Sequence, residues 1–145
     1  MSVEDLSQKA VSALVKQHPD WEKYVTGKLE GIIIDVPAIE NPSMAKGLFF
    51  HSDGAGIEVN MDDDHEHFFP WDYDSDELLI QDMCEFVNEL VEEKIISALF
   101  EDGDRRIGSC WLEPGEDVRS AWEHGNPTFV RLKSWRGTYD QEINL

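Results

Sequence analysis

Two histidines separated by a single residue, His65 and His67, are the first candidates for chemistry in this sequence. On an extended strand, residues i and i+2 project from the same face, so both imidazoles could bind one metal ion. Four other side chains could supply a further ligand: Asp62, Asp64, His51 and Cys84. No motif specifies that ligand, so we expect no bound metal and no cofactor. The alternatives for the pair are packing against Phe69 and contact with a partner.

The familiar catalytic motifs are absent. The run Asp62-Asp63-Asp64 lacks the central glycine and the terminal glutamate of a calcium-binding EF-hand. The sequence contains no G-x-S-x-G nucleophile elbow, and the D-G-A-G run at 53–56 lacks the lysine and the following helix of a phosphate-binding loop. We therefore expect that the protein is not an enzyme. A small metal-binding or hydrolytic enzyme that uses His65 and His67 is the alternative.

Acidic residues are concentrated in the middle of the chain. The 145 residues include 31 Asp and Glu against 12 Lys and Arg, which gives a formal net charge of −19. Residues 47–93 carry 15 carboxylates and no Lys or Arg. Such a field disfavours binding to nucleic-acid phosphates or to an anionic membrane surface, and it favours a basic protein partner. A further alternative is a non-catalytic adaptor domain whose acidic residues only increase its solubility.

Aromatic side chains are interleaved with this acid in segment 62–77. Aromatic anchors inside a charged field combine binding energy with electrostatic steering. The partner-binding residues that we predict are Asp62, Asp63, Asp64, Glu66, Asp72, Tyr73, Asp74 and Asp76. We expect them to converge on one edge of a sheet, with Tyr73 as the anchor.

Several residues of this segment also have competing structural explanations. Phe68, Phe69 and Trp71 could instead fill the core. Asp74 and Asp76 could cap a helix. For the aspartates at 62–64 we expect no structural role, which makes them the strongest candidates for a partner contact.

The elements that must position these residues follow from the spacing of apolar side chains. Helices are predicted over 3–17 and 75–93, the second capped by Asp74 or Ser75, with a buried stripe of Leu79, Met83, Phe86, Val87 and Leu90. Strands are predicted at 29–36, 47–52, 57–61, 95–100, 105–112 and 128–137, with a short continuation at HEHFF. The first of these strands should be buried on both faces. We therefore predict one two-layer α+β domain over residues 1–145, with the order α-β-β-β-α-β-β-β. Its mainly antiparallel sheet of about six strands should pack against two helices.

The two cysteines and the hydropathy indicate a compartment. Cys84 and Cys110 lie singly in apolar surroundings, as expected of reduced, buried thiols. The first residues lack a basic stretch followed by an apolar one, and no apolar run approaches the roughly 18 residues of a membrane helix. We expect a cytoplasmic protein without a membrane segment.

Three segments carry a resemblance to a known class: LEGIIIDVPAIENPS (29–43), HEHFF (65–69) and SWRGTYDQEI (134–143). With the hairpin and the amphipathic helix between them, the chain resembles the immunity proteins of bacterial polymorphic-toxin and contact-dependent growth inhibition systems. Acidic residues are more closely spaced over 58–77 than in the immunity proteins that the chain resembles. The resemblance implies a protein that binds and blocks one cognate toxin domain, commonly a nuclease. A nuclease needs a basic substrate groove, and an acidic inhibitor would complement such a groove.

Overall fold

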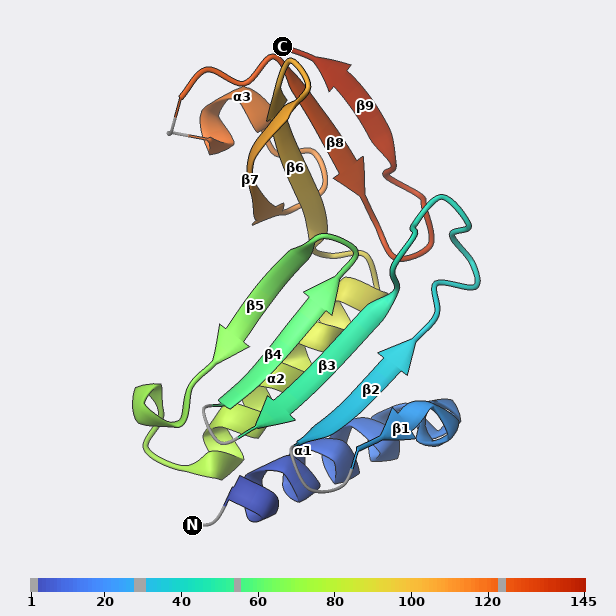
Figure 1. Ribbon diagram of the computed structural model, residues 1–145, viewed down its shortest axis with the longest axis vertical. Helices are drawn as coiled ribbons and strands as arrows, with labels where there is room; N and C mark the ends of the chain where they lie inside the picture. The colour runs from blue at the N-terminus through green and yellow to red at the C-terminus, as the bar shows by residue number, and fades with distance from the viewer. Residues whose placement is uncertain (1–2, 28–30, 54–55, 123–124) are drawn as a thin grey trace.

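Two antiparallel sheets, one beyond the end of the other, form the framework of the molecule (Figure 1). The computed structural model describes residues 3–27, 31–53, 56–122 and 125–145. The first sheet has the strand order β1-β2-β3-β4-β5, and the second has the order β7-β6-β8-β9. The α+β class and the antiparallel pairing are confirmed. The prediction of a single sheet of about six strands is wrong, because the strand that follows the long helix pairs with later strands and not with the first sheet.

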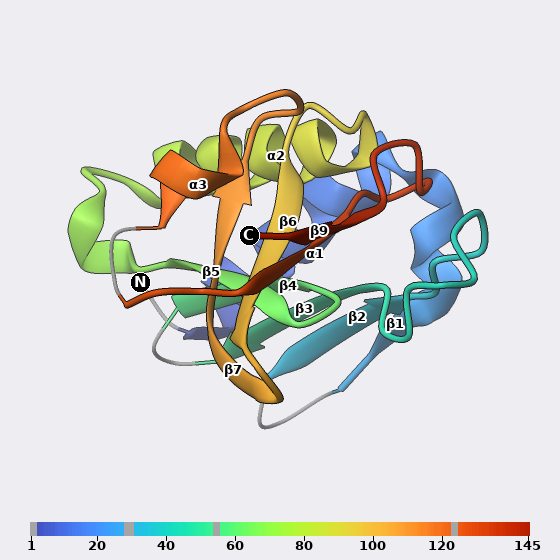
Figure 2. The ribbon, with the colours of Figure 1, turned by 90° about the horizontal axis from the view of Figure 1, so that it is seen from above.

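The first sheet is a meander in which each strand pairs with the next. Its strands are β1 (Val25–Thr26), β2 (Ile32–Val36), β3 (Leu48–Asp53), β4 (Gly56–Met61) and β5 (Asp64–Phe68). Helices α1 (Val3–Gln17) and α2 (Asp76–Val91) cover one face of it (Figures 1 and 2). The main core lies between, and Leu14, Leu48, Val59 and Met83 are almost completely buried there.

None of the described helices lies over the other face of the first sheet (Figure 2). Along β2, Ile34 and Val36 are buried, whereas Asp35 between them is exposed. The prediction that this strand is buried on both faces is therefore wrong, because both helices pack on the same side. Residues 29 and 30 of the predicted strand lie outside the described residues.

Helix α2 matches its prediction closely. The Ser75 side chain caps it by accepting a hydrogen bond from the Leu78 backbone N–H at 3.3 Å. Leu79, Met83, Val87 and Leu90 of the predicted stripe are buried, as is Cys84. Phe86 is only partly buried, and its ring packs at the sheet junction against Phe68 and Trp111, with centroid distances of 5.9 and 5.2 Å.

The second sheet builds a smaller core of its own. It contains β6 (Ile96–Asp102), β7 (Arg105–Leu112), β8 (Phe129–Lys133) and β9 (Gln141–Asn144), the last of which was not predicted. Helix α3 (Val118–Ala121) and Trp122 pack against Phe100 and its neighbours. Gly108 permits this contact, because a Cβ atom there would collide with the Trp122 ring. Two 3-10 helices, Pro19–Tyr24 and Pro70–Asp72, complete the fold.

Over the residues that the structure describes, none of the helices combines the length and the apolar character that crossing a bilayer requires.

Candidate partner-binding surface

The uncovered face of the first sheet gathers polar and aromatic side chains from four strands. Cross-strand pairing aligns one row of residues Ile33, His51, Glu58 and His67, and a second row of Asp35, Phe49, Asn60 and His65. Three of the five histidines in the chain therefore share this face. A groove of about 670 Å³ lies at its end, where Phe49 and Asn60 meet the loop after β2.

Four rings form a continuous row of ring contacts along the edge of this face, which we call the aromatic ridge: His65, His67, Phe69 and Trp71. Successive centroids are 5.1, 5.4 and 4.7 Å apart. His65 and His67 share this face because alternate residues of β5 project from the same side, and Phe69 and Trp71 extend the row beyond the end of the strand. Trp71 ends the ridge and is 70% exposed.

The ridge explains the histidine pair without a metal. The His65 and His67 rings meet edge to face at an interplanar angle of 75°, and the His67 ring lies flat on Phe69. Packing of the pair against Phe69, one of the predicted alternatives, is therefore confirmed. Within the described part of the chain, no three His, Cys, Asp or Glu side chains are grouped so that they could hold a metal ion.

Exposed acidic and apolar side chains adjoin the Trp71 end of the ridge. Asp72 and Asp74 are exposed, and no described residue forms an ion pair with either. Leu78, in the first turn of α2, is 47% exposed. Glu77 is partly neutralised, because Lys9 pairs with it at 3.1 Å. This end of the molecule thus presents apolar surface beside uncompensated negative charge.

The aromatic residues of the segment divide between core and surface. Phe68 is buried in the main core, as the structural alternative predicted. Tyr73 is half-buried against the same core, and burial together with a hydrogen bond to Asp82 raises the pKa of its hydroxyl. Trp71 is far more exposed than Tyr73, so Trp71 is the more accessible candidate for an anchor.

The three aspartates at 62–64 all have structural roles, contrary to prediction. Asp62 takes a positive φ of 53° in the β4–β5 turn and accepts a hydrogen bond from the Lys46 backbone N–H at 3.1 Å. Asp63 pairs with Arg106 of β7 at 3.1 Å and with Lys46 at 3.5 Å. These contacts tie the turn to the neighbouring loop and to the second sheet.

Asp64 is buried, with 3% of its surface exposed. Its carboxylate accepts hydrogen bonds from Ser97 Oγ at 3.3 Å, from Ser109 Oγ at 3.0 Å and from the His65 backbone N–H at 2.9 Å. Burial outweighs these donors and raises the pKa of Asp64. The residue joins β5 to β6 and β7, and it is not available to a partner in this conformation.

The predicted acidic residues do not gather at one place. Asp62 and Asp63 precede β5, whereas Asp72 and Asp74 follow it at the opposite end (Figure 1). The four residue steps of β5, at about 3.4 Å each, separate its ends by about 14 Å. The predicted residues therefore do lie along one edge of the sheet, the strand β5, but they form two groups at its two ends and not a single cluster.

Glu66 and Asp76 complete the predicted set. Glu66 projects from the helix-covered side of β5, opposite Val59, and is half-buried. Asp76 is half-buried in the first turn of α2, and its Oδ2 atom is buried without a hydrogen-bond partner among the described residues. The cap itself is Ser75, so neither Asp74 nor Asp76 fulfils the capping role.

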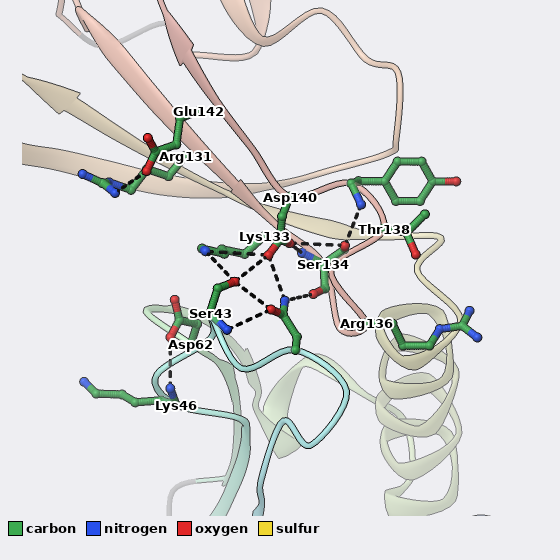
Figure 3. Close-up of polar contacts among 12 residues, drawn as sticks. Ser43, Lys46, Asp62, Arg131, Lys133, Ser134, Arg136, Thr138, Asp140 and Glu142 are labelled. Carbon is green, nitrogen blue, oxygen red and sulfur yellow. Dashed lines mark hydrogen bonds and ion pairs between the residues drawn. The ribbon is translucent and has the colours of Figure 1, made fainter.

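Asp140, which sequence reasoning missed, holds the second sheet to the first (Figure 3). It accepts hydrogen bonds from Asn41 Nδ2 and from Ser43 Oγ, both at 2.9 Å, and from the Ser134 backbone N–H at 2.8 Å. Lys133 lies 3.7 Å away. Burial alone would raise the pKa of Asp140, but these donors together lower it. The loop after β2 is thereby fixed to the turn between β8 and β9.

Glu93 makes a second link of the same kind. Its carboxylate is almost fully buried and accepts hydrogen bonds from Thr138 Oγ1, from the Thr138 N–H at 3.1 Å and from Arg136 Nε at 3.2 Å. The bond from Thr138 Oγ1 is 2.6 Å long. Burial opposes ionisation, yet the donors outweigh it and lower the pKa of Glu93. The sequence contains no signal for this link, because Glu93 falls within the predicted helix 75–93, whereas in the structure it lies two residues beyond the end of α2.

No protein-family model matches this chain, and no curated protein or solved structure matches it either.

Proposed function

We propose that this chain is a cytoplasmic immunity protein, without catalytic activity, that binds and neutralises a basic toxin domain. The single observation that carries the proposal is Trp71, which is 70% exposed at the end of the aromatic ridge beside the exposed Asp72 and Asp74. Exposed tryptophan is enriched among the residues that dominate the energy of protein interfaces. In this position it would anchor a partner that the two carboxylates attract.

The charge of the whole chain supports a basic partner. A net charge of −19 produces a long-range field that accelerates association with a positively charged protein. A nuclease toxin presents a basic groove to its nucleic-acid substrate, so an acidic inhibitor complements its active surface. The packing of His65 and His67 within the ridge supports a binding role for the pair in place of a catalytic one.

The test is to examine the genes beside the gene for this chain for a toxin domain, and then to measure whether the chain protects bacteria from that domain. Induction of that domain alone should arrest growth, and co-expression of the chain should restore it. Trp71→Ala should abolish or strongly weaken protection. Ile39→Ala is the matched control, because Ile39 is equally exposed, at 75%, but lies in a loop away from the ridge.

A second pair of variants isolates the acidic residues. Asp72→Asn/Asp74→Asn should weaken binding of the purified toxin domain, whereas Asp102→Asn/Asp104→Asn removes the same charge from the β6–β7 turn and should bind normally. Full protection and unchanged affinity in both the Trp71 variant and the Asp72/Asp74 variant would refute this surface. Failure of the unmodified chain to protect would refute the function itself.

A further inference from the structure

The groove at one end of the uncovered face of the first sheet is separate from the surface around Trp71. It has a volume of about 670 Å³ and lies where the loop after β2 meets residues of β2, β3 and β4. Asp62, which lines the groove, precedes β5, whereas Trp71 follows β5 at its opposite end (Figure 1). The groove and the aromatic ridge are therefore two distinct features of one surface.

Apolar side chains form much of the groove wall. Pro37, Ala38, Met44 and Ala45 come from the loop, and Phe49 comes from β3. Phe49 lies on the uncovered face of the sheet and is only half-buried. A concavity of this size accommodates a side chain such as leucine, whose entry would remove apolar surface of both molecules from water.

Hydrogen bonds hold the loop in place, so the groove is formed before any partner binds. Asn41 Nδ2 and Ser43 Oγ each donate to Asp140 at 2.9 Å (Figure 3). At the other end of the loop, the Lys46 backbone N–H donates to Asp62 at 3.1 Å (Figure 3). Binding to an ordered site costs less conformational entropy than binding to a mobile loop.

The rim of the groove carries negative charge that the protein itself does not balance. Asp35 and Asp62 have no ion-pair partner among the described residues. Glu58 lies 3.9 Å from His67, which is charged only when it is protonated. Lys46 is the one basic residue in the lining, and it pairs at 3.5 Å with a carboxylate that does not line the groove. Charge complementarity therefore requires an occupant with positive charge beside its apolar part.

The carboxylates lie on two sides of the apolar wall. In the register of the sheet, Asp35 of β2 and Asn60 of β4 flank Phe49 of β3. Glu58 is two residues from Asn60 along β4. With strands about 4.8 Å apart and a rise of about 3.4 Å per residue, the backbone positions of Asp35 and Glu58 are about 12 Å apart. In an extended polypeptide, residues i and i+4 are about 13 Å apart and share one side with residue i+2 between them.

We propose that this groove binds an extended segment of a basic protein, with a basic, an apolar and a second basic residue at alternate positions. The apolar side chain enters the groove against Phe49, and the two basic side chains reach Asp35 and Glu58. Only the source of the segment rests on the proposed function, which would make it part of the basic toxin domain.

The experiment titrates the full chain, labelled with carbon-13 in its alanine methyl groups, with the peptide acetyl-Gly-Lys-Gly-Leu-Gly-Lys-Gly-amide. Ala38 and Ala45 line the groove, and their NMR signals are identified by their loss in Ala38→Ser and Ala45→Ser. Both signals should shift as the peptide is added. The signals of Ala98 and Ala121, which belong to the core of the second sheet, should stay in place.

Two control peptides separate the apolar contribution from the charge. A peptide with glycine in place of leucine keeps both charges and should bind about tenfold more weakly or worse, because it buries no apolar side chain. A peptide with glutamine in place of both lysines keeps the leucine and should bind about threefold more weakly or worse. Equal binding of the three peptides would overturn the proposal.

Two double variants with equal charge changes locate the binding site. Asp35→Asn/Glu58→Gln should raise the dissociation constant of the lysine–leucine peptide about threefold or more, and added salt should reduce the difference. Asp102→Asn/Asp104→Asn removes two exposed carboxylates from the β6–β7 turn and should change the constant less than about twofold. Equal weakening by both variants, or groove methyl signals that do not move, would also overturn the proposal.

The toxin assay separates this groove from the proposed function. Protection by the unmodified chain without peptide binding would refute the groove as a site and leave the immunity role intact. Peptide binding at the groove without protection would support the groove and exclude the toxin domain as the source of the segment.

Discussion

At the scale of single residues, Glu93 occupies a backbone position that usually belongs to glycine. Helix α2 ends with the Lys94 N–H bonded to the Glu89 carbonyl and the Glu93 N–H bonded to the Leu90 carbonyl, which is a Schellman motif. In this motif the residue after the C-cap takes a left-handed conformation. Here that residue is Glu93, which has a φ of 60°. The backbone cost is offset by the bonds that its buried carboxylate makes with Arg136 and Thr138.

This arrangement reverses the usual effect of glycine at a helix end. Glu93→Gly removes the left-handed strain, which is worth about 1–2 kcal/mol, but it also removes the carboxylate that accepts four hydrogen bonds from Arg136 and Thr138, each worth about 0.5–1.5 kcal/mol. We expect a net loss of about 1–2 kcal/mol in the free energy of unfolding, measured in urea. Glu93→Gln keeps one acceptor oxygen and should lose less. A Gly variant more stable than the wild type would show that the carboxylate contributes little.

The two cysteines should react slowly in the native state. Burial raises the pKa of the Cys84 thiol. Burial, followed by the charges of Asp64 and Glu116, raises the pKa of Cys110 to about 11. Because the thiolate is the reactive form, both should be labelled by a disulfide reagent at pH 8 far more slowly than in urea. Rapid labelling of both without denaturant would contradict this environment.

At the scale of elements, the spacing of apolar residues predicted the helix α2. It did not predict which face of the strand β5 is buried, because that depends on contacts with residues distant in the sequence. The stripe from Leu79 to Leu90 identified α2 because one helix face alone is buried. In β5 the pattern misleads: Asp64 and Glu66 project toward the covered side and His65 and His67 toward the open side. Polar residues on both faces give no sign of which is inside. The burial of Asp64 depends on Ser97 and Ser109, more than 30 residues away.

The face of α2 can be tested with two adjacent leucines. Leu79 is completely buried, whereas Leu78 is 47% exposed. Leu79→Ala should cost about 2–5 kcal/mol of unfolding free energy through the lost contacts and the cavity that remains. Leu78→Ala should change stability by about 0.5 kcal/mol at most. Similar costs at the two positions would show that the helix is rotated from the described orientation.

At the scale of the whole molecule, three carboxylates with shifted pKa values, Glu93, Asp140 and Asp64, lie where the second sheet meets the rest of the fold and respond differently to acid. Glu93 and Asp140 have lowered pKa values, so their contribution to stability is present above their unfolded values of 4.5 and 3.8 and is lost as the pH falls further. Asp64 has a raised pKa, so its protonation favours the folded state.

Acid should therefore weaken the junction mainly through Glu93 and Asp140. We expect the melting temperature of the wild type to fall below about pH 4.5. Glu93→Gln/Asp140→Asn should be less stable at pH 7 and should show a shallower fall. Asp64→Asn should steepen the fall, since among the three junction carboxylates Asp64 is the one whose protonation favours the folded state. Parallel curves for all variants would place the acid sensitivity elsewhere.

The sequence indicates the acidic and aromatic character of the proposed binding surface, but it does not show which of those residues are exposed. The excess of acid and the interleaved aromatic residues are visible without a structure, and Asp72 and Asp74 are exposed as expected. Exposure of Trp71 and burial of Asp64 depend on the tertiary fold. Aspartates of one short segment therefore differ in their surroundings: Asp72 and Asp74 are exposed to solvent, whereas Asp64 is buried between the two sheets.

The most direct test of the immunity role is the rate of association with the cognate toxin domain, measured by stopped flow at low and high ionic strength. We expect Asp72→Asn/Asp74→Asn to associate severalfold more slowly than the wild type at low salt. The difference should shrink when salt screens the charges. Asp102→Asn/Asp104→Asn, with the same net charge, should associate almost as fast as the wild type. Equal slowing of the two variants, or an unchanged rate in the first, would contradict a partner surface at the end of the aromatic ridge.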